Sequence, residues 1–283
     1  AATIPAATDA LDREAVRRIR DAGADQMALS LDFPDAASHD AFRGVEGAFR
    51  KTMDAVGWAH ELGLPLQINT TLCGMNADRL EEMAEFVGGL DIVFWEVFFL
   101  VPMGRGAALG GLQASQCERL FDVLHRAQTS RRFVVKVTEA PHYRRHVALR
   151  QGGGRPAASA PVTQMPAMLT RSEGPGHTIG LAPRGVNAGN GFLFVSHQGD
   201  VYPSGFLPWR AGNVRQEPLD ALYRNHELFR ALRDPERLHG RCGRCEFRRI
   251  CGGSRARAFA LTGDAFATDP WCAYEPRGDA GAN

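Results

Sequence analysis

Four of the six cysteines lie in one segment near the C-terminus, with the spacing C-x2-C-x5-C-x20-C. They are Cys242, Cys245, Cys251 and Cys272. Thiolates are ligands for zinc and for iron–sulfur clusters, and four of them complete either kind of site. Zinc ribbons usually carry two close cysteine pairs, whereas only Cys242 and Cys245 form such a pair here. The spacing predicts a metal centre and leaves a [4Fe–4S] cluster and a structural zinc ion as alternatives.

Disulfide bonds are a weaker interpretation of these cysteines. The sequence shows no apolar signal segment, and a chain of 283 residues has a core that needs no cross-links. No apolar run reaches the roughly 20 residues of a membrane span. The formal net charge of +1 gives no support for a nucleic-acid or membrane partner. We therefore expect a cytoplasmic globular protein that holds a metal centre.

The elements before the cysteines alternate between helix and strand. Helices are expected at residues 12–22, 47–62, 76–87 and 115–127, and strands at 26–32, 65–72, 92–102 and 133–138. Asp12 can cap the first helix, and Ser115 with Glu118 can form a capping box for the last. Strands alternating with helices of this length indicate a parallel sheet, whose ligands bind at the C-terminal ends of the strands.

The remaining chain has a different character. Residues 151–185 contain three consecutive glycines and several prolines, which indicates a linker or mobile loop. A hairpin is expected at residues 191–203, and a helix at 219–232 leads into the cysteine segment. The metal centre would supply folding energy that a domain spanning only 186–283 lacks in its core.

Several segments together resemble the radical S-adenosylmethionine (AdoMet) enzymes that carry a C-terminal cluster domain of the SPASM or shorter twitch type. Ser30-Leu31-Asp32 looks like their fourth barrel strand, Gln67–Thr71 like the fifth, and Leu100–Gly106 like the sixth with its exit loop. Val201–Phe206 looks like the hairpin that opens the cluster domain, and the four cysteines match auxiliary [4Fe–4S] ligands. The relatives suggested are enzymes of heme d1 and alternative heme biosynthesis and of peptide-derived cofactor maturation.

The resemblance implies an α/β fold, with a partial (β/α) barrel of the radical SAM type at residues 1–150 and a small α+β cluster domain at 186–283. The family's C-x3-C-x2-C motif, which holds the cluster that cleaves AdoMet, is absent from the chain. We therefore expect an N-terminally truncated barrel that binds a cluster without cleaving AdoMet. In a complete enzyme, cleavage would form a 5′-deoxyadenosyl radical, and the auxiliary cluster would transfer electrons or anchor the substrate.

The resemblance also implies an AdoMet site. Ser30 and Asn69 would hydrogen-bond the ribose and methionine parts, and Arg43 would pair with the carboxylate. Backbone atoms of Leu100 and Val101 would contact the adenine. Without the resemblance, Ser30 and Asn69 are ordinary polar residues at strand ends.

Glu96 and Arg105 are the candidate substrate contacts. Glu96 lies in an apolar strand, where a buried carboxylate needs a partner or a function, although it could also face outward at a rim. The expected partners are a small-molecule or peptide substrate and an electron-donor protein. Two rivals remain: a non-catalytic scaffold stabilised by zinc, and an ordinary α/β barrel enzyme that uses Asp32, Glu96 and Glu139.

Six arginines flank the cysteines: Arg241, Arg244, Arg248, Arg249, Arg255 and Arg257. They either tune a cluster or form a solvated basic surface. His142 and His146 lack the glutamate of an H-E-x-x-H motif, and we interpret them as part of a solvated basic helix face. Cys73 and Cys117 stand apart from the other cysteines and are expected to be buried small hydrophobic residues.

Overall fold

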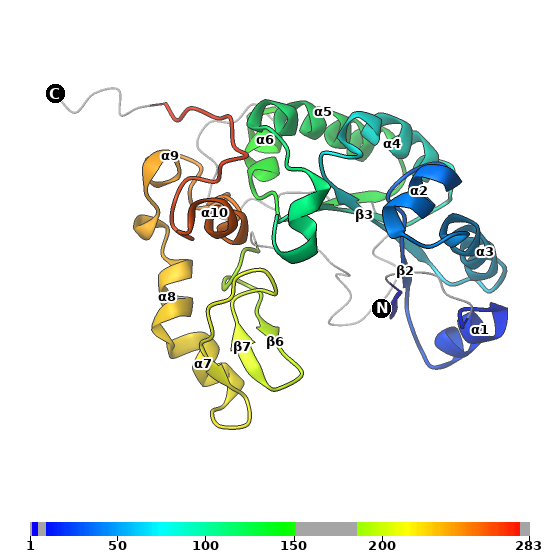
Figure 1. The fold of residues 1–283 in the computed structure, drawn as a ribbon, viewed down its shortest axis with the longest axis horizontal. Coiled ribbons are helices and arrows are strands. Elements are labelled where there is room, and N and C mark those ends of the chain that lie inside the picture. Colours follow the sequence, from blue (N-terminus) through cyan, green and yellow to red (C-terminus); the bar gives the residue numbers. More distant parts are fainter. Residues whose placement is uncertain (1, 5–9, 151–185, 278–283) are drawn as a thin grey trace. The chain divides into compact units, whose positions relative to one another are not determined.

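The computed structural model describes residues 2–4, 10–150 and 186–277. These residues form two compact units (Figure 1). The first contains the described residues up to Phe99 together with Asp122–Thr138, and the second contains Leu100–Phe121 and the described residues from Glu139 onward. The linker or mobile loop expected at 151–185 lies outside the described residues.

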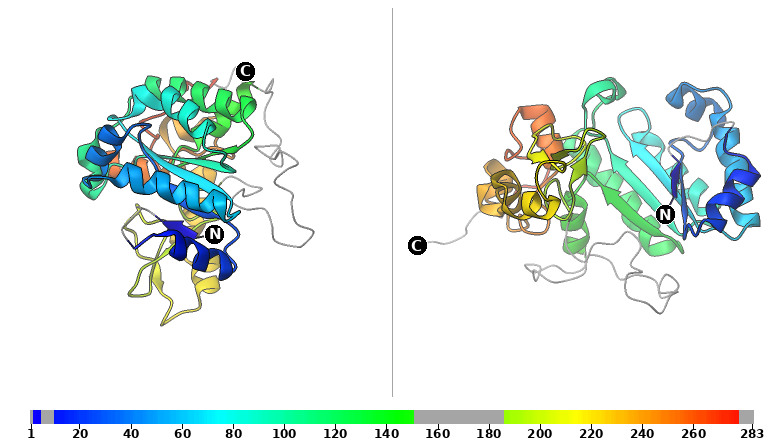
Figure 2. Two further views of the ribbon diagram at one scale, coloured as in Figure 1. Left: turned by 90° about the vertical axis from the view of Figure 1, so that its right-hand side faces the viewer. Right: turned by 90° about the horizontal axis from the view of Figure 1, so that it is seen from below.

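A parallel sheet forms the centre of the first unit (Figure 2). Its strands are β1 (Ala2–Ile4), β2 (Met27–Ser30), β3 (Leu66–Leu72), β4 (Phe94–Phe99) and β5 (Val134–Thr138). They are hydrogen-bonded in chain order, and each neighbouring pair is parallel. Parallel neighbours need a crossover connection, and helices supply it here. The predicted α/β fold class is confirmed.

The helices that accompany the sheet are α1 (Arg13–Asp21), α2 (Ala36–Arg43), α3 (Ala48–Glu61) and α4 (Leu80–Gly88), the last preceded by the 3-10 turn η1 (Ala77–Arg79). Helix α1 begins as predicted, because the Asp12 side chain accepts a hydrogen bond from the Ala15 amide at 2.7 Å. Helix α3 begins after Gly47, whose φ of 74° lies in the left-handed region.

Strand β3 shows that the two faces of the sheet differ. Leu66, Ile68 and Leu72 are buried, whereas Gln67 and Asn69 between them are partly exposed. Successive residues of a strand point to opposite faces, so one face is apolar and the other polar. Figure 1 shows α2, α3 and α4 along one side of the sheet. We call the other side, which carries Gln67 and Asn69, the polar face.

Helix α5 (Ala114–Ser130) begins differently from the prediction. The capping box of Ser115 and Glu118 is wrong, because the helix already includes Ser115. Instead, the Gln116 side chain accepts a hydrogen bond from the Gln113 amide at 2.8 Å. Glu118 forms an ion pair with Arg145 of the second unit, to which Glu118 also belongs.

The second unit combines short helices with a small antiparallel sheet. Its strands are β6 (Phe194–Val195), β7 (Asp200–Tyr202) and β8 (Gly212–Asn213). Its helices are α6 (His142–Arg150), α7 (Leu219–Asn225), α8 (Glu227–Arg233), α9 (Gly240–Gly243) and α10 (Arg255–Thr262), with 3-10 turns η2 (Gly104–Leu109) and η4 (Pro235–Arg237). Val101, Leu207 and Ala256 contribute to its hydrophobic core. Among the described helices, none has the length and apolar composition of a membrane span.

The helix predicted at residues 219–232 is interrupted. His226 adopts an extended conformation between α7 and α8, with φ −60° and ψ 134°. Its imidazole Nδ1 accepts a hydrogen bond from the Leu228 amide at 3.2 Å, which caps α8. Both helices bury apolar residues, Leu222 from α7 and Phe229 from α8, in one small core with Val201. The break therefore begins a second helix whose apolar side faces the same core.

Candidate functional site

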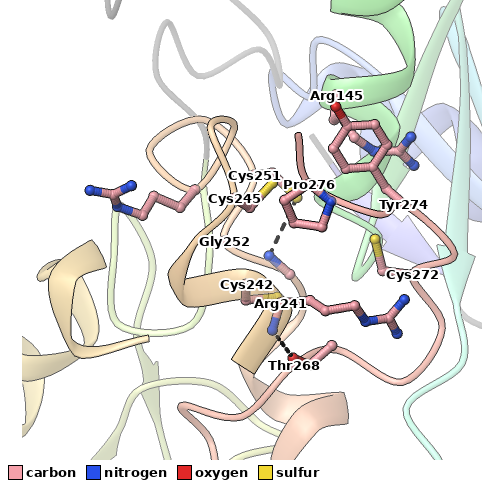
Figure 3. A pocket seen from close by; sticks show the side chains of 12 residues that line it. Arg145, Arg241, Cys242, Cys245, Cys251, Gly252, Thr268, Cys272, Tyr274 and Pro276 are labelled. Carbon is pink, nitrogen blue, oxygen red and sulfur yellow. Dashed lines mark hydrogen bonds between the residues drawn. The ribbon is translucent and has the colours of Figure 1, made fainter. Parts of the chain in front are cut away.

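The four cysteines of the predicted metal centre line one cavity in the second unit (Figure 3). Cys242 lies in α9, Cys245 and Cys251 follow in the next turns, and Cys272 comes from a separate segment near the end of the described chain. None of them forms a disulfide bond. The fold thus brings Cys272 to the same cavity as Cys251, although 20 residues separate them in the sequence.

The turn that carries the first two cysteines is held by contacts between its backbone and neighbouring segments. The Arg241 amide donates to Thr268 Oγ1 at 2.8 Å, which joins α9 to the segment that leads to Cys272 (Figure 3). A Cβ added to Gly243 would lie 2.2 Å from the Leu238 carbonyl oxygen, so only glycine fits there. The turn between Cys242 and Cys245 therefore requires glycine at position 243.

Burial disfavours the thiolate form of three of the four cysteines. Burial raises the pKa of Cys245 and of Cys251, and it raises the pKa of Cys272 to about 11. A metal binds the thiolate, so loading the site must release protons. The Gly253 amide already donates to Cys251 Sγ at 3.4 Å, a contact that stabilises a thiolate.

The donor set fits an iron–sulfur centre. All four thiols surround a common cavity, as they must when each binds a different iron of one cluster. The cavity is also lined by Tyr274 and Pro276.

The six arginines near the cysteines divide into two groups. Arg241 and Arg248 line the cavity but pair with glutamates, at 2.8 Å from Glu275 and 3.0 Å from Glu236. Arg249 also pairs with Glu236, and Arg244 is exposed. Arg255 and Arg257 are buried, with 2% and 0% of their surface exposed. The structure thus separates two buried arginines from four that are paired with glutamates or exposed.

Helix α6 corrects another expectation. His142 is fully buried and His146 is 7% exposed, so they do not form a solvated face. The His142 ring packs edge-on against Phe121, with ring centroids 4.8 Å apart. Burial lowers the pKa of His142 to about 4 and keeps it neutral. The expectation was wrong because it rested on the basic composition of α6, whereas other segments of the second unit bury most of this helix. Cys73 and Cys117 are buried, as predicted.

A row of polar residues crosses the first unit's sheet on its polar face. Ser30 is paired with Asn69, Asn69 with Glu96, and Glu96 with Lys136, on four adjacent strands. Directly paired residues of neighbouring strands share a face. Three predicted site residues, Ser30, Asn69 and Glu96, therefore lie in one row across the polar face. Lys136 is the fourth residue of this row, and it was not predicted from the sequence. Its only sequence signal was a lysine in an otherwise apolar strand.

Glu96 is buried but has three partners. It lies 2.8 Å from Lys136 Nζ and accepts hydrogen bonds from Thr138 Oγ1 at 2.7 Å and Gln67 Nε2 at 2.9 Å. Gln67 Nε2 also donates to Asn69 Oδ1 at 2.7 Å. This bond uses the amide oxygen of Asn69 and leaves its nitrogen to donate to a ligand.

Arg43 and Asp32 form a second charged pair in this unit. Arg43 Nη2 lies 2.5 Å from Asp32 Oδ2, and the Thr71 amide donates to Asp32 Oδ1 at 2.8 Å. Burial raises the pKa of Asp32, which Arg43 and Thr71 partly offset. Arg43, predicted to meet a ligand carboxylate, is thus already paired with a carboxylate of the chain.

The other predicted residues belong to the second unit. Leu100 and Val101 directly follow β4 and are buried, and Arg105 is an exposed residue of η2. Glu139, one of three strand-end carboxylates proposed for an ordinary barrel enzyme, accepts a hydrogen bond from Ser254 Oγ at 2.5 Å. Asp32, Glu96 and Glu139 are therefore all engaged within the protein.

Replacing Lys136 with methionine is expected to destabilise the chain by about 1–3 kcal/mol, because Glu96 would keep a buried charge without its cation. The loss is limited because 35% of the lysine side chain is exposed and water can partly replace it. Urea unfolding measures the change. Arg13→Met is the control, since it removes an exposed ion pair with Glu61 and should cost less than about 1 kcal/mol. Equal losses in the two variants would contradict the prediction.

The parallel sheet and the four-cysteine cavity define an α/β protein with a metal-binding unit at its C-terminal side. Residues 3–87 match the Radical SAM superfamily, and residues 187–246 match the iron–sulfur cluster-binding domain called SPASM. The AdoMet-dependent heme synthase of Methanosarcina barkeri is 37% identical over 266 residues, which cover 94% of this chain and 72% of that protein. The chain belongs to the radical SAM superfamily, among the members that carry a SPASM domain.

Two further comparisons agree with this assignment. The pre-heme d1 synthase of Dinoroseobacter shibae is 28% identical over 271 residues, which cover 90% of this chain and 63% of that protein. The crystal structure of Streptococcus suis SuiB has a TM-score of 0.65 at 15% identity, and the match covers 96% of this chain and 60% of SuiB. The chain thus spans about two thirds of the relatives that it matches, and the likeness to SuiB concerns the fold.

Proposed function

We propose that the chain acts in a radical SAM maturase of the heme-synthase type and that its second unit holds an auxiliary [4Fe–4S] cluster. The observation that carries the proposal is the convergence of Cys242, Cys245, Cys251 and Cys272 on one cavity. The SPASM match ends at residue 246, so it includes only the first two of these cysteines. In support of the other two, Cys251 and Cys272 line the same cavity as the first pair.

The chain's own residues would prepare this site. The four cysteines would hold the cluster, and the Gly253 amide would continue to donate to the sulfur of Cys251. Arg145, paired with Glu118, has its guanidinium 4.7 Å from the ring centroid of Tyr274, which keeps this wall of the cavity in place. When bound, such a cluster supplies one-electron redox chemistry.

On the polar face, Ser30 and Asn69 are the proposed contacts of AdoMet. In support, the Gln67 side chain holds the oxygen of the Asn69 amide, so that the amide nitrogen serves as a donor. We propose that Arg43 acts mainly through Asp32, which it already binds. The adenine contact of Leu100 and Val101, and substrate contacts of Glu96 and Arg105, remain proposals that follow the family resemblance.

The proposed substrate is a tetrapyrrole-like small molecule. Its support is the higher identity to the heme synthase, at 37%, than to the PqqA peptide cyclase of Methylocella silvestris, at 28%. A peptide substrate is the alternative from the resemblance to peptide-cofactor maturases. An electron-donor protein is also proposed, because a redox cluster needs a source of electrons.

The test is the iron and acid-labile sulfide content of the anaerobically reconstituted chain, with an electron paramagnetic resonance spectrum of the reduced protein. About four irons and four sulfides per chain are expected. Cys245→Ala should lose this centre, whereas Cys73→Ala, which removes a buried thiol of the first unit, should keep it. About one zinc without sulfide would overturn the cluster and favour the zinc-stabilised alternative.

A further inference from the structure

Two buried arginines near the cysteines differ in how their charge is balanced. Arg257 binds Asp269 through two hydrogen bonds, Nε to Oδ1 at 3.0 Å and Nη2 to Oδ2 at 2.7 Å. Its guanidinium also lies 4.4 Å from the ring centroid of Trp271. A bidentate carboxylate compensates a guanidinium charge well, so Arg257 needs no further anion.

Arg255 has no such partner. Its Nη1 donates to the carbonyl oxygens of Ala265 at 2.7 Å and Ala267 at 2.8 Å, and its Nε donates to that of Gly253 at 3.3 Å. Its remaining nitrogen, Nη2, lies 3.9 Å from Cys242 Sγ. Across the part of the chain that the structure describes, no carboxylate lies within ion-pair distance of Arg255. Carbonyl groups are dipoles and supply no net negative charge.

Arg144 shows the same pattern beside another cysteine. Its guanidinium donates to the carbonyl oxygens of Ile250 at 3.2 Å and Val186 at 2.7 Å, and no ion pair joins it to a carboxylate of the described residues. Burial lowers its pKa, and the neighbouring Cys251 opposes that change. Two guanidinium groups without a carboxylate thus lie beside two of the four cysteines.

A buried charge is costly unless an opposite charge compensates it. Asp264 interacts with the Arg255 charge only beyond ion-pair distance, and its carboxylate lies 2.5 Å from His239 Nε2. With a cluster bound by four thiolates, the site is net anionic, and Cys242 Sγ is one of its ligands. We propose that Arg255 is the internal counter-ion of the cysteine-bound centre, with Arg144 as a second, and that it sets the reduction potential of that centre.

The direction of this effect follows from charge. Reduction adds an electron to a centre that is already negative, so a nearby fixed positive charge and a hydrogen bond to sulfur both stabilise the reduced form. Arg255 is therefore a positioning and tuning residue that acts through Cys242. The inference rests on the proposed iron–sulfur centre, whose presence in the unmodified chain is established first.

The experiment measures the midpoint potential of the reconstituted centre by redox titration followed by paramagnetic resonance. Arg255→Gln is expected to make the potential more negative, and Arg255→Lys, which keeps the charge, is expected to stay closer to the unmodified value. Arg144→Gln should shift the potential in the same direction. Arg248→Gln is the control, because Arg248 lines the same cavity but is paired with Glu236.

Each outcome is decisive. Equal potentials in Arg255→Gln and the unmodified chain would overturn the inference and leave the cluster proposal intact. If Arg255→Gln binds no iron, the lysine variant decides: retained iron supports a charge requirement, whereas loss in both variants shows a purely structural role and overturns the inference. Absence of iron and sulfide from the unmodified chain would overturn the proposed function itself.

Discussion

Replacing Arg257 with methionine is expected to lower the free energy of unfolding by about 3–5 kcal/mol. The change leaves Asp269, which is fully buried, without the guanidinium that compensates its charge. The Ser254 and Trp271 amides would still donate to this carboxylate, at 2.8 and 3.1 Å, but they carry no net charge. Loss of Arg257 also removes its hydrogen bond to the Glu139 carbonyl at 2.7 Å.

Urea unfolding followed by tryptophan fluorescence measures this effect, because the ring of Trp271 lies against the Arg257 guanidinium. Arg248→Met is the matched control, since it breaks a partly exposed pair with Glu236 and should cost less than about 1 kcal/mol. The double variant Arg257→Met with Asp269→Leu should recover part of the loss, because it leaves no buried charge unpaired. A loss in Arg257→Met no larger than in the control would contradict the prediction.

The same pair predicts a dependence on pH. Burial alone would raise the pKa of Asp269, but the Arg257 charge, together with His142 and the hydrogen bonds from Arg257 and the Ser254 amide, holds that pKa below its ordinary value. A carboxyl with a lower pKa in the folded state stabilises the fold above its unfolded pKa of about 4, and this contribution falls as pH drops toward the folded value. The difference in stability between the unmodified chain and Arg257→Met should therefore shrink as pH falls below about 4.

Replacing Gly253 with alanine is expected to cost about 2–5 kcal/mol, through backbone strain and overpacking together. Its φ of 64° lies in the left-handed region, which disfavours a side chain. An added Cβ would also lie 2.5 Å from Arg255 Nη2 and 2.7 Å from Asp269 Cβ. The Arg255 guanidinium is held by the carbonyl oxygens of Ala265 and Ala267, and Asp269 Cβ is attached directly to the backbone, so neither atom moves away easily.

Gly263→Ala is a matched control for this prediction. Gly263 has a φ of 78°, yet an added Cβ would meet nothing within 4 Å. It therefore carries the strain without the overpacking and should cost about 1–2 kcal/mol. Thermal or urea unfolding of both variants separates the two contributions. Iron content of the reconstituted Gly253→Ala chain is a second readout, since the change displaces Arg255 from Cys242. A Gly253→Ala chain as stable as Gly263→Ala would show that the crowding is relieved at little cost.

Much of the first unit's fold was predictable because its signals are local. Asp12 caps α1, glycine precedes α3, and alternating apolar residues mark β3, each of which depends on residues adjacent in sequence. The beginning of α5 and the break at His226 were not predictable in this way. In both places several polar residues are suitable caps, and the structure uses the side chains of Gln116 and His226, each of which accepts a hydrogen bond from a backbone amide.

The candidate sites show the same division. Cysteine type and spacing predicted the four ligands, since few other residues form such a set, and the fold brings all four to one cavity. The polar row was only partly foreseen: Ser30, Asn69 and Glu96 were named, but Lys136 was not. Its place beside Glu96 follows from the register of β4 and β5, which the pairing of separate strands decides.

By itself, the sequence determined the kind of protein: an alternating α/β chain that ends in a four-cysteine metal site, in the order typical of radical SAM proteins with a SPASM domain. Only the tertiary structure decided which charges are internal. Three arginines that are close in sequence show this. Arg248 pairs with an exposed glutamate, Arg255 contacts the sulfur of Cys242, and Arg257 pairs with a buried aspartate. Burial and partner choice depend on segments distant in the chain, so spacing alone cannot distinguish a solvated arginine from one that balances a buried centre.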